Sequence, residues 1–306
     1  MNIEFEPLCD LHGGSKLATR GYLCHMSSRQ FTITGFIKLT RFWNLLIIVF
    51  SQYFTAVFLV SPGKVWDINL FFLSTATVVI AAAGYIINDY YDVKIDLINK
   101  PERVVIGKDV ARRYAILSHS VLSFIGVAIG FWLNWKIGVI NFLSAFLLWW
   151  YSNNLKRQPF VGNFVVAFLT GLSVFLINVL YGTHQPLVTI YAIFAFVMTL
   201  IREIVKDMED LKGDNTFGCK TLPIIWGTRK TKFLIYFLLT LLFGTVIYIN
   251  QVYKQLPQLY FFIFLFVPLV FLLARLVRAD TKKDFYYLSQ WCKVIMLLGV
   301  MSMVFI

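Results

Sequence analysis

The sequence predicts an all-α, polytopic membrane protein with about nine transmembrane helices. Of its 306 residues, 58% are hydrophobic and only 14% are charged, whereas soluble domains carry about 25% charged residues. The apolar residues form long uninterrupted stretches, and about 20 such residues cross a bilayer. The charged residues between these stretches collect mainly on one side. We therefore expect lipid to surround much of the surface.

The chain divides into a polar segment and a membrane domain. Residues 1–35 lack the apolar core of about 7–15 residues that marks a signal peptide, and we expect a polar cytoplasmic lead-in there. Residues 36–306 are expected to form a single transmembrane domain. The apolar stretches lie at 36–60, 69–89, 112–133, 137–154, 162–182, 186–205, 233–250, 256–276 and 286–306.

The basic residues predict the orientation. With the N-terminus in the cytoplasm, 24 of the 28 Lys and Arg residues fall on the cytoplasmic side, and Lys293 lies within the last stretch. Only Lys64, Lys136 and Lys254 fall on the far side. Cytoplasmic loops of membrane proteins carry such an excess. The same excess accounts for the net charge of +12 without nucleic acid as a partner.

Two aspartate triplets share the spacing DxxDxxxD, in the segments NDYYDVKID and DMEDLKGD. Their members are Asp89, Asp92 and Asp96, then Asp207, Asp210 and Asp214. At 100° per residue, each triplet forms one stripe on a helix. Each follows an even-numbered stretch, so both are expected at the cytoplasmic side, where they can face one another.

Such stripes are unfavourable without a cation. Like charges one turn apart cost a few tenths of a kcal/mol, and carboxylates at a helix C-terminus cost about 0.3–1 kcal/mol more. Oxygen ligands without His or Cys suit Mg²⁺. The alternative is a solvated, charged loop at the membrane edge, but the shared spacing on one side disfavours it.

Polar residues near these stripes are further candidates. Arg41 and Asn44 stand near the start of an apolar stretch, where a polar residue is a functional candidate, although Arg41 can also snorkel to the interface. Basic residues beside the triplets can bind phosphate or serve only as topology charges. They are Lys94, Lys100 and Arg103 near the first triplet, and Lys206 and Lys212 near the second.

Cysteine and histidine are too scattered to indicate a disulfide framework or an iron centre. Residues Cys9, His12, Cys24 and His25 group together, but their spacing fits no standard zinc finger. Aromatic residues are abundant, with 30 Phe, 15 Tyr and 8 Trp. If a carbocation forms, a few of them can stabilise it through cation–π contacts.

Four segments resemble the UbiA superfamily of intramembrane prenyltransferases over residues 36–306. They are NDYYDVKID, INKPERVVIG, YSNNLKRQPFVGN and REIVKDMEDLKGD. The longer stretch REIVKDMEDLKGDNTFGCKTLPIIWG most resembles the digeranylgeranylglyceryl phosphate synthase branch. One departure is Val104, which stands where the family usually has a second Pro and leaves the rigidity of that loop in question.

The resemblance implies helices around a central cavity, with two Mg²⁺ ions holding the diphosphate of a polyprenyl donor at its cytoplasmic mouth. The implied metal ligands are Asn88, Asp92 and Asp96 opposite Asp210 and Asp214, with Asp89 and Asp207 as outer or alternate ligands. Lys100 and Arg103 are expected to bind the diphosphate. Lys156 and Tyr151 are expected to border the acceptor or the leaving group, and Arg157 can serve an acceptor phosphate. Arg41 and Asn44 complete the expected substrate-binding residues.

The expected function is Mg²⁺-dependent transfer of a polyprenyl group from a prenyl diphosphate to a membrane-associated acceptor. A glycerol-phosphate lipid acceptor is favoured over an aromatic acceptor of quinone biosynthesis, of the 4-hydroxybenzoate or naphthoate type. A cation-coupled transporter is the alternative of another class, but the acids lie at helix ends and no paired broken helices are evident. A non-catalytic isoprenoid-binding relative is disfavoured because both Asp motifs are intact. We expect a prokaryotic cell membrane, an active site facing the cytoplasm and no obligate protein partner.

Overall fold

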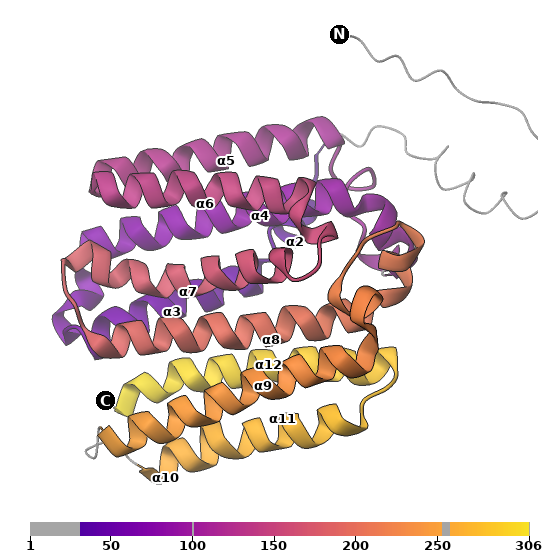
Figure 1. Ribbon diagram of the computed structural model, residues 1–306. Helices are drawn as coiled ribbons and strands as arrows, with labels where there is room; N and C mark the ends of the chain where they lie inside the picture. The colour runs from indigo at the N-terminus through magenta and orange to yellow at the C-terminus, as the bar shows by residue number, and fades with distance from the viewer. Residues whose placement is uncertain (1–30, 100, 253–257, 306) are drawn as a thin grey trace, which may run out of the picture.

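The structure, a computed structural model, describes residues 31–99, 101–252 and 258–305 as a bundle of helices lying side by side (Figure 1). Its long helices are α3 (Phe42–Leu59), α4 (Ile68–Asn99), α5 (Arg112–Leu133), α6 (Trp135–Asn153), α7 (Val161–Tyr181), α8 (Pro186–Thr216), α9 (Leu222–Val252), α11 (Val267–Arg278) and α12 (Lys282–Met301). The short α10 (Gln258–Phe261) and a π-helical turn (Phe262–Phe266) lead directly into α11. The predicted all-α fold of about nine helices is confirmed. The grouping Cys9, His12, Cys24 and His25 lies outside the described residues.

Eight helical runs are long and apolar enough to cross a membrane, and one of them, Leu259–Arg278, passes through α10, the π-helical turn and α11 without a break. The ninth, α6, is of similar length and runs beside α5 (Figure 1). It contains the polar residues Lys136 and Asn141 and is not among the eight candidate spans. Asn141 is buried and donates to the carbonyl of Gly126 on α5 at 3.0 Å, so its polarity is satisfied inside the bundle.

The first predicted stretch, 36–60, is two helices rather than one. A short helix, α2 (Ile33–Leu39), is capped by Thr32 and ends before Arg41, whose φ of 54° is left-handed. That conformation costs roughly 1–2 kcal/mol for a residue other than Gly. The backbone of Thr32 donates to the carbonyl of Asp109 at 3.2 Å, which ties α2 to the loop after α4. The left-handed turn therefore separates a helix at the bundle end from the spanning helix α3.

The two Asp-bearing helices, α4 and α8, are among the longest in the bundle. α4 has 32 residues and α8 has 31, or roughly 46–48 Å at 1.5 Å per residue, against about 30 Å of hydrocarbon. Their last turns extend beyond the predicted stretches 69–89 and 186–205, and they carry the triplets to one end of the bundle (Figure 1). We call this the Asp-rich end.

Helices α4 and α8 also occupy the middle of the bundle. In their apolar windows, 56% and 67% of residues are buried, against 11% in α5. α8 packs on α7 and α4 on one side and on α9 and α12 on the other (Figure 1). Gly171 of α7 allows a close approach to α8, because a Cβ there would lie 2.8 Å from the carbonyl oxygen of Ala192. The central position of α4 and α8 places the triplets around an interior space.

The opposite end of the bundle is closed by a polar contact between the α3–α4 and α7–α8 connections. Lys64 Nζ lies 4.2 Å from the ring centre of Tyr181 and 3.4 Å from Asp67 Oδ2. Asp67 also accepts from the backbone amide of Asn69 at 2.9 Å. Burial raises the pKa of Asp67, but hydrogen bonds from Asn69, Tyr181 and Lys64 outweigh it and hold that pKa below its ordinary value.

Candidate active site

Two adjoining cavities open between the central helices. A polar cavity of about 520 Å³ lies at the Asp-rich end, and an apolar cavity of about 250 Å³ lies deeper in the bundle. They share a set of polar and charged lining residues, namely Arg41, Asn44, Asn88, Tyr151, Arg202, Glu203, Lys206 and Lys293. The arrangement suits an amphipathic ligand with an anionic head at one end and a hydrocarbon chain at the other.

The polar cavity is lined by both aspartate triplets. All six carboxylates, Asp89, Asp92, Asp96, Asp207, Asp210 and Asp214, border this one space. Each triplet lies on one face of its helix because residues three and seven positions apart share a face, and α4 and α8 present these faces to each other. Residues more than 100 positions apart in sequence are thereby brought to one site.

Each triplet is held by polar partners from other helices. Lys156 Nζ lies 2.5 Å from Asp92 Oδ1, and an Arg41 terminal nitrogen lies 2.6 Å from Asp89 Oδ1. Asn163 donates to Asp207 at 2.8 Å. These contacts offset the repulsion among carboxylates that share a face.

The carboxylates do not form a complete metal cage. Among the described residues, no group of three or more His, Cys, Asp or Glu side chains is close enough to hold one ion. Mg²⁺ usually takes only one or two carboxylates and completes its shell with substrate phosphates and water, so a closed cage is not required. Asn88 Oδ1 is buried beside the cavity and accepts no hydrogen bond from the described residues. An orphan buried acceptor costs about 1–3 kcal/mol, and a cation would satisfy it. The donor set therefore fits Mg²⁺.

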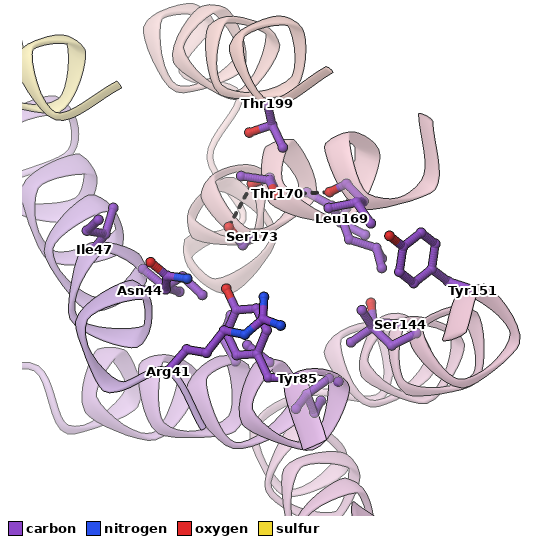
Figure 2. A pocket seen from close by; sticks show the side chains of 18 of the residues that line it. Arg41, Asn44, Ile47, Tyr85, Ser144, Tyr151, Leu169, Thr170, Ser173 and Thr199 are labelled. Atoms are coloured by element: carbon purple, nitrogen blue, oxygen red, sulfur yellow. Dashed lines mark hydrogen bonds between the residues drawn. The ribbon is translucent and has the colours of Figure 1, made fainter. Parts of the chain in front are cut away.

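Arg41 lies at the junction of the two cavities (Figure 2). Its guanidinium stands 5.0 Å from the ring centre of Tyr85 while it binds Asp89. Burial disfavours the charged guanidinium, but Asp89 and Tyr85 more than compensate and raise the pKa of Arg41 above its ordinary value. Arg41 therefore points inward, with Asn44 one turn further along α3, and does not snorkel to the interface.

The remaining expected substrate-binding residues are distributed unevenly. Tyr151 near the end of α6 lines both cavities, and Lys156 follows in the short 3-10 helix Leu155–Arg157. Arg157 is exposed and lines neither cavity. Lys100 lies outside the described residues, as does the side chain of Arg103, whose backbone ends the 3-10 helix Pro101–Arg103.

Four further charged residues line the site, of which only Lys206 was a candidate from the sequence, as a lysine beside the second triplet. Arg202, Glu203 and Lys206 of α8 and Lys293 of α12 all line both cavities. Arg202 and Lys293 fall within the apolar stretches 186–205 and 286–306. A charged residue at membrane depth is a functional candidate, and this signal, which selected Arg41, was sufficient to find them.

The surface that lines the apolar cavity is mostly apolar, although polar residues contribute to it as well. Figure 2 shows Ile47 and Leu169 among the lining residues, together with the polar side chains of Ser144, Thr170 and Thr199. Tyr85 and Tyr151 are the aromatic residues among its lining. Tyr151 also lines the polar cavity. Tyr85 contacts the guanidinium of Arg41, which lines both cavities.

Comparisons with known proteins agree with this architecture. Residues 49–293 match the model of the UbiA prenyltransferase family. The digeranylgeranylglyceryl phosphate synthase of Methanosphaera stadtmanae is 30% identical over 271 residues, which cover 87% of this chain and 97% of that protein.

Solved structures support the same fold. One described as that of a digeranylgeranylglyceryl phosphate synthase in membranes has a TM-score of 0.67 and 24% identity, covering 89% of this chain and 97% of its own. A UbiA homolog from Archaeoglobus fulgidus bound to DMAPP and Mg²⁺ has a TM-score of 0.59 and 14% identity, covering 89% of this chain and 99% of its own. With the family match over residues 49–293 and the relative of 30% identity, the chain belongs to the UbiA prenyltransferase family.

Proposed function

We propose that this prenyltransferase moves a polyprenyl group from a prenyl diphosphate to the free hydroxyl of a glycerol-phosphate lipid. The observation that carries the proposal is the pair of adjoining cavities, one lined by six carboxylates and the other by aliphatic side chains. The first suits a diphosphate that arrives with cations, and the second suits its hydrocarbon chain.

The metal would be Mg²⁺, as two ions, held with the diphosphate by oxygen ligands from α4 and α8. The proposed ligands are Asn88, Asp92, Asp96, Asp210 and Asp214, with Asp89 and Asp207 as outer or alternate ligands. Bound Mg²⁺ would act as a Lewis acid that neutralises the leaving diphosphate. The solved Archaeoglobus homolog with DMAPP and Mg²⁺ supports this choice of metal.

The chain's own residues orient the reactants. Lys156, held at Asp92, places a positive charge beside the departing diphosphate, and Arg41, held at Asp89, places another at the junction. Lys100, Arg103, Asn44 and Tyr151 remain proposed substrate contacts. The aliphatic cavity excludes water from the allylic C1.

The transfer exchanges one bond for another. The bond between C1 and the diphosphate oxygen breaks, and the acceptor hydroxyl oxygen forms an ether bond to C1. The diphosphate leaves with the bonding electrons, and the hydroxyl proton passes to water in the polar cavity. No oxidant or reductant is required.

The acceptor class rests on the curated relatives. Proteins at 30% and 33% identity that this chain covers over 97% and 89% of their length are digeranylgeranylglyceryl phosphate synthases. An aromatic acceptor of the 4-hydroxybenzoate or naphthoate type is the alternative. A transporter is disfavoured, because α4 and α8 run as continuous helices past both triplets, whereas transporters bind ions at broken helices.

The orientation is also part of the proposal. The Asp-rich end is proposed to face the cytoplasm, in a prokaryotic cell membrane, with residues 1–35 as a cytoplasmic lead-in. The basic residues support this, since Lys64 and Lys136 lie near helix ends opposite the Asp-rich end and most others do not.

An acceptor panel tests the proposal. The purified protein in detergent would be incubated with Mg²⁺, radiolabelled geranylgeranyl diphosphate and either geranylgeranylglyceryl phosphate or 4-hydroxybenzoate, and the extracted products would be separated. We expect product with the glycerol-phosphate lipid. Transfer to the aromatic acid alone would reject the proposed acceptor and leave the family assignment in place.

A further inference from the structure

Three basic side chains meet at the boundary between the polar and the apolar cavity, on the side away from Lys156. Arg202 and Lys206 come from α8 and Lys293 comes from α12, and all three line both cavities. We call Arg202, Lys206 and Lys293 the junction cluster. They surround the buried carboxylate of Glu203, which is 8% exposed.

The junction cluster is built by two helix faces in direct contact. Residues 199, 202, 203, 206 and 210 share one face of α8, and residues 289, 293 and 296 share one face of α12. Thr199 of the first face lies 3.6 Å from the sulfur of Met296 on the second. Lys293 therefore enters the cavity from within the spanning segment Lys282–Phe305, well away from the membrane surface where topology charges belong.

The three cations of the junction cluster share the carboxylate of Glu203. Arg202 forms an ion pair with Glu203, Lys206 approaches the same carboxylate at 3.9 Å, and Lys293 acts on it electrostatically. Asp210 also acts on Lys206. In addition, Arg202 Nε is buried and donates no hydrogen bond to the described residues. An idle buried donor is costly, and a bound anion would accept a hydrogen bond from it.

The donor diphosphate has its place elsewhere in the polar cavity. Its proposed ligands on α8 are Asp210 and Asp214, and Arg202 precedes Asp210 by eight positions, or about 12 Å along the helix axis. Lys156 is engaged with Asp92 on the opposite wall, and Arg157 lines neither cavity. Lys206, four positions before Asp210 on α8, lies between the two places. A second anion held at Arg202 and Lys293 would therefore sit apart from the first.

The acceptor supplies such an anion, if the proposed function is correct. Glycerol has three oxygen positions, and a product with two prenyl ethers and one phosphate uses all of them. The acceptor's free hydroxyl thus lies within two carbons of its phosphate. That hydroxyl must reach C1 of the donor, which lies where the diphosphate cavity meets the hydrocarbon cavity. The acceptor phosphate must then lie at the same boundary, and the junction cluster is the cationic surface there.

We propose that Arg202, Lys206 and Lys293 bind the phosphate of the acceptor, at a subsite distinct from the metal-bound diphosphate. This inference rests on the proposed function and assigns the acceptor specificity of the same site. The planar guanidinium of Arg202 offers paired donors to phosphate oxygens. Lys293 supplies a charge that no residue near it in sequence can replace.

Lys293 gives the cleanest test, because removing Arg202 would also leave Glu203 without its ion-pair partner. The variants are Lys293→Gln, the charge-preserving Lys293→Arg, and Lys283→Gln as a matched control from the exposed start of the same helix. Each would be assayed with two acceptors, geranylgeranylglyceryl phosphate and geranylgeranylglycerol, the same lipid without phosphate. The KM of each acceptor and of the prenyl diphosphate would be measured separately.

Loss of a charge-assisted hydrogen bond predicts a KM for the phosphorylated acceptor about tenfold to a hundredfold higher in Lys293→Gln. The KM of the donor and the transfer to the phosphate-free lipid should stay as in the wild type, which also shows that the variant is folded. Lys293→Arg should retain most of the preference for phosphate, and Lys283→Gln all of it.

Two outcomes would overturn the inference alone: a Lys293→Gln variant that keeps the wild-type preference for phosphate, or one that loses transfer to both acceptors equally. A wild-type enzyme that prenylates 4-hydroxybenzoate and neither glycerol lipid would overturn the proposed function and the inference together. The wild-type acceptor series therefore separates the two failures.

Discussion

Replacing Lys156 with Met should destabilise the protein most when metal and donor are absent. Lys156 Nζ lies 2.5 Å from Asp92 Oδ1, and the two side chains are only 10% and 16% exposed. Removing one partner of a buried ion pair costs about 3–5 kcal/mol, since the other charge stays buried. The residual exposure of this pair reduces the expected loss to about 2–3 kcal/mol.

Bound metal and donor should reduce the loss of stability in Lys156→Met. If Asp92 binds Mg²⁺ with the prenyl diphosphate, the carboxylate regains a cationic partner and the variant recovers part of its stability. We expect Mg²⁺ with a non-reactive thio-analogue of the donor to raise the apparent melting temperature more in Lys156→Met than in the wild type. The turnover number should still fall, because the positive charge beside the leaving diphosphate is gone.

Thermal unfolding in detergent, followed by intrinsic fluorescence with and without ligand, measures this difference. Arg157→Met is the matched control, since Arg157 is adjacent, exposed and outside both cavities. The variant Asp92→Asn combined with Lys156→Met should be more stable than Lys156→Met alone, because no buried charge is left without a partner. A Lys156→Met protein as stable as Arg157→Met in the absence of ligand would refute this reasoning.

Three further predictions concern other parts of the molecule. Tyr151→Leu should lower the turnover number by about twofold to thirtyfold, because an aromatic face at C1 is worth about 0.5–2 kcal/mol to a cation. Tyr151→Phe should largely retain the wild-type turnover number, and equal rates for both variants would argue against this role. Folding lowers the pKa of Asp67, so its carboxylate stabilises the fold at pH values above the ordinary carboxyl pKa of 3.8. This stabilisation is lost as the pH falls through the lower pKa of the folded state. The melting temperature of Asp67→Asn should therefore be below that of the wild type at pH 7, and this difference should narrow as the pH falls below 3.8. A difference that stays constant would contradict the assignment. Gly171→Ala should destabilise the protein by about 1–3 kcal/mol, because the added methyl group overpacks the α7–α8 contact. Gly244→Ala is the control, since a Cβ there meets nothing within 4 Å. Equal melting temperatures for the two variants would contradict a close approach of α7 and α8 at Gly171.

The periodic and compositional features of the fold could be read from the sequence. The long helices follow from apolar stretches, and the common face of each triplet follows from its spacing. The break at Arg41 could not be read, because residues 36–60 contain neither Gly nor Pro between Phe36 and Val60 and a left-handed Arg has no local signature. The tie between Thr32 and Asp109 that shapes this end depends on a contact 77 residues apart.

The site was predictable in its acids and less so in its cations. Asp92 and Asp210 repeat a pattern, but the partner of Asp92 is Lys156, 64 residues away, and only packing of α6 against α4 brings them together. Arg157 has the same local sequence context as Lys156 and faces outward. Lys293 was visible as a charge inside an apolar stretch, yet its place beside α8 depends on how α12 packs.

The central claim is that the triplets on α4 and α8 jointly bind Mg²⁺ with the donor diphosphate. The most direct measurement is Mg²⁺-dependent binding of radiolabelled geranylgeranyl diphosphate to the wild type, Asp92→Ala and Asp210→Ala in detergent, alongside transfer activity. We predict that each single variant stays folded, loses the Mg²⁺-dependent part of donor binding and loses transfer. Wild-type binding and full activity in both variants would contradict the claim.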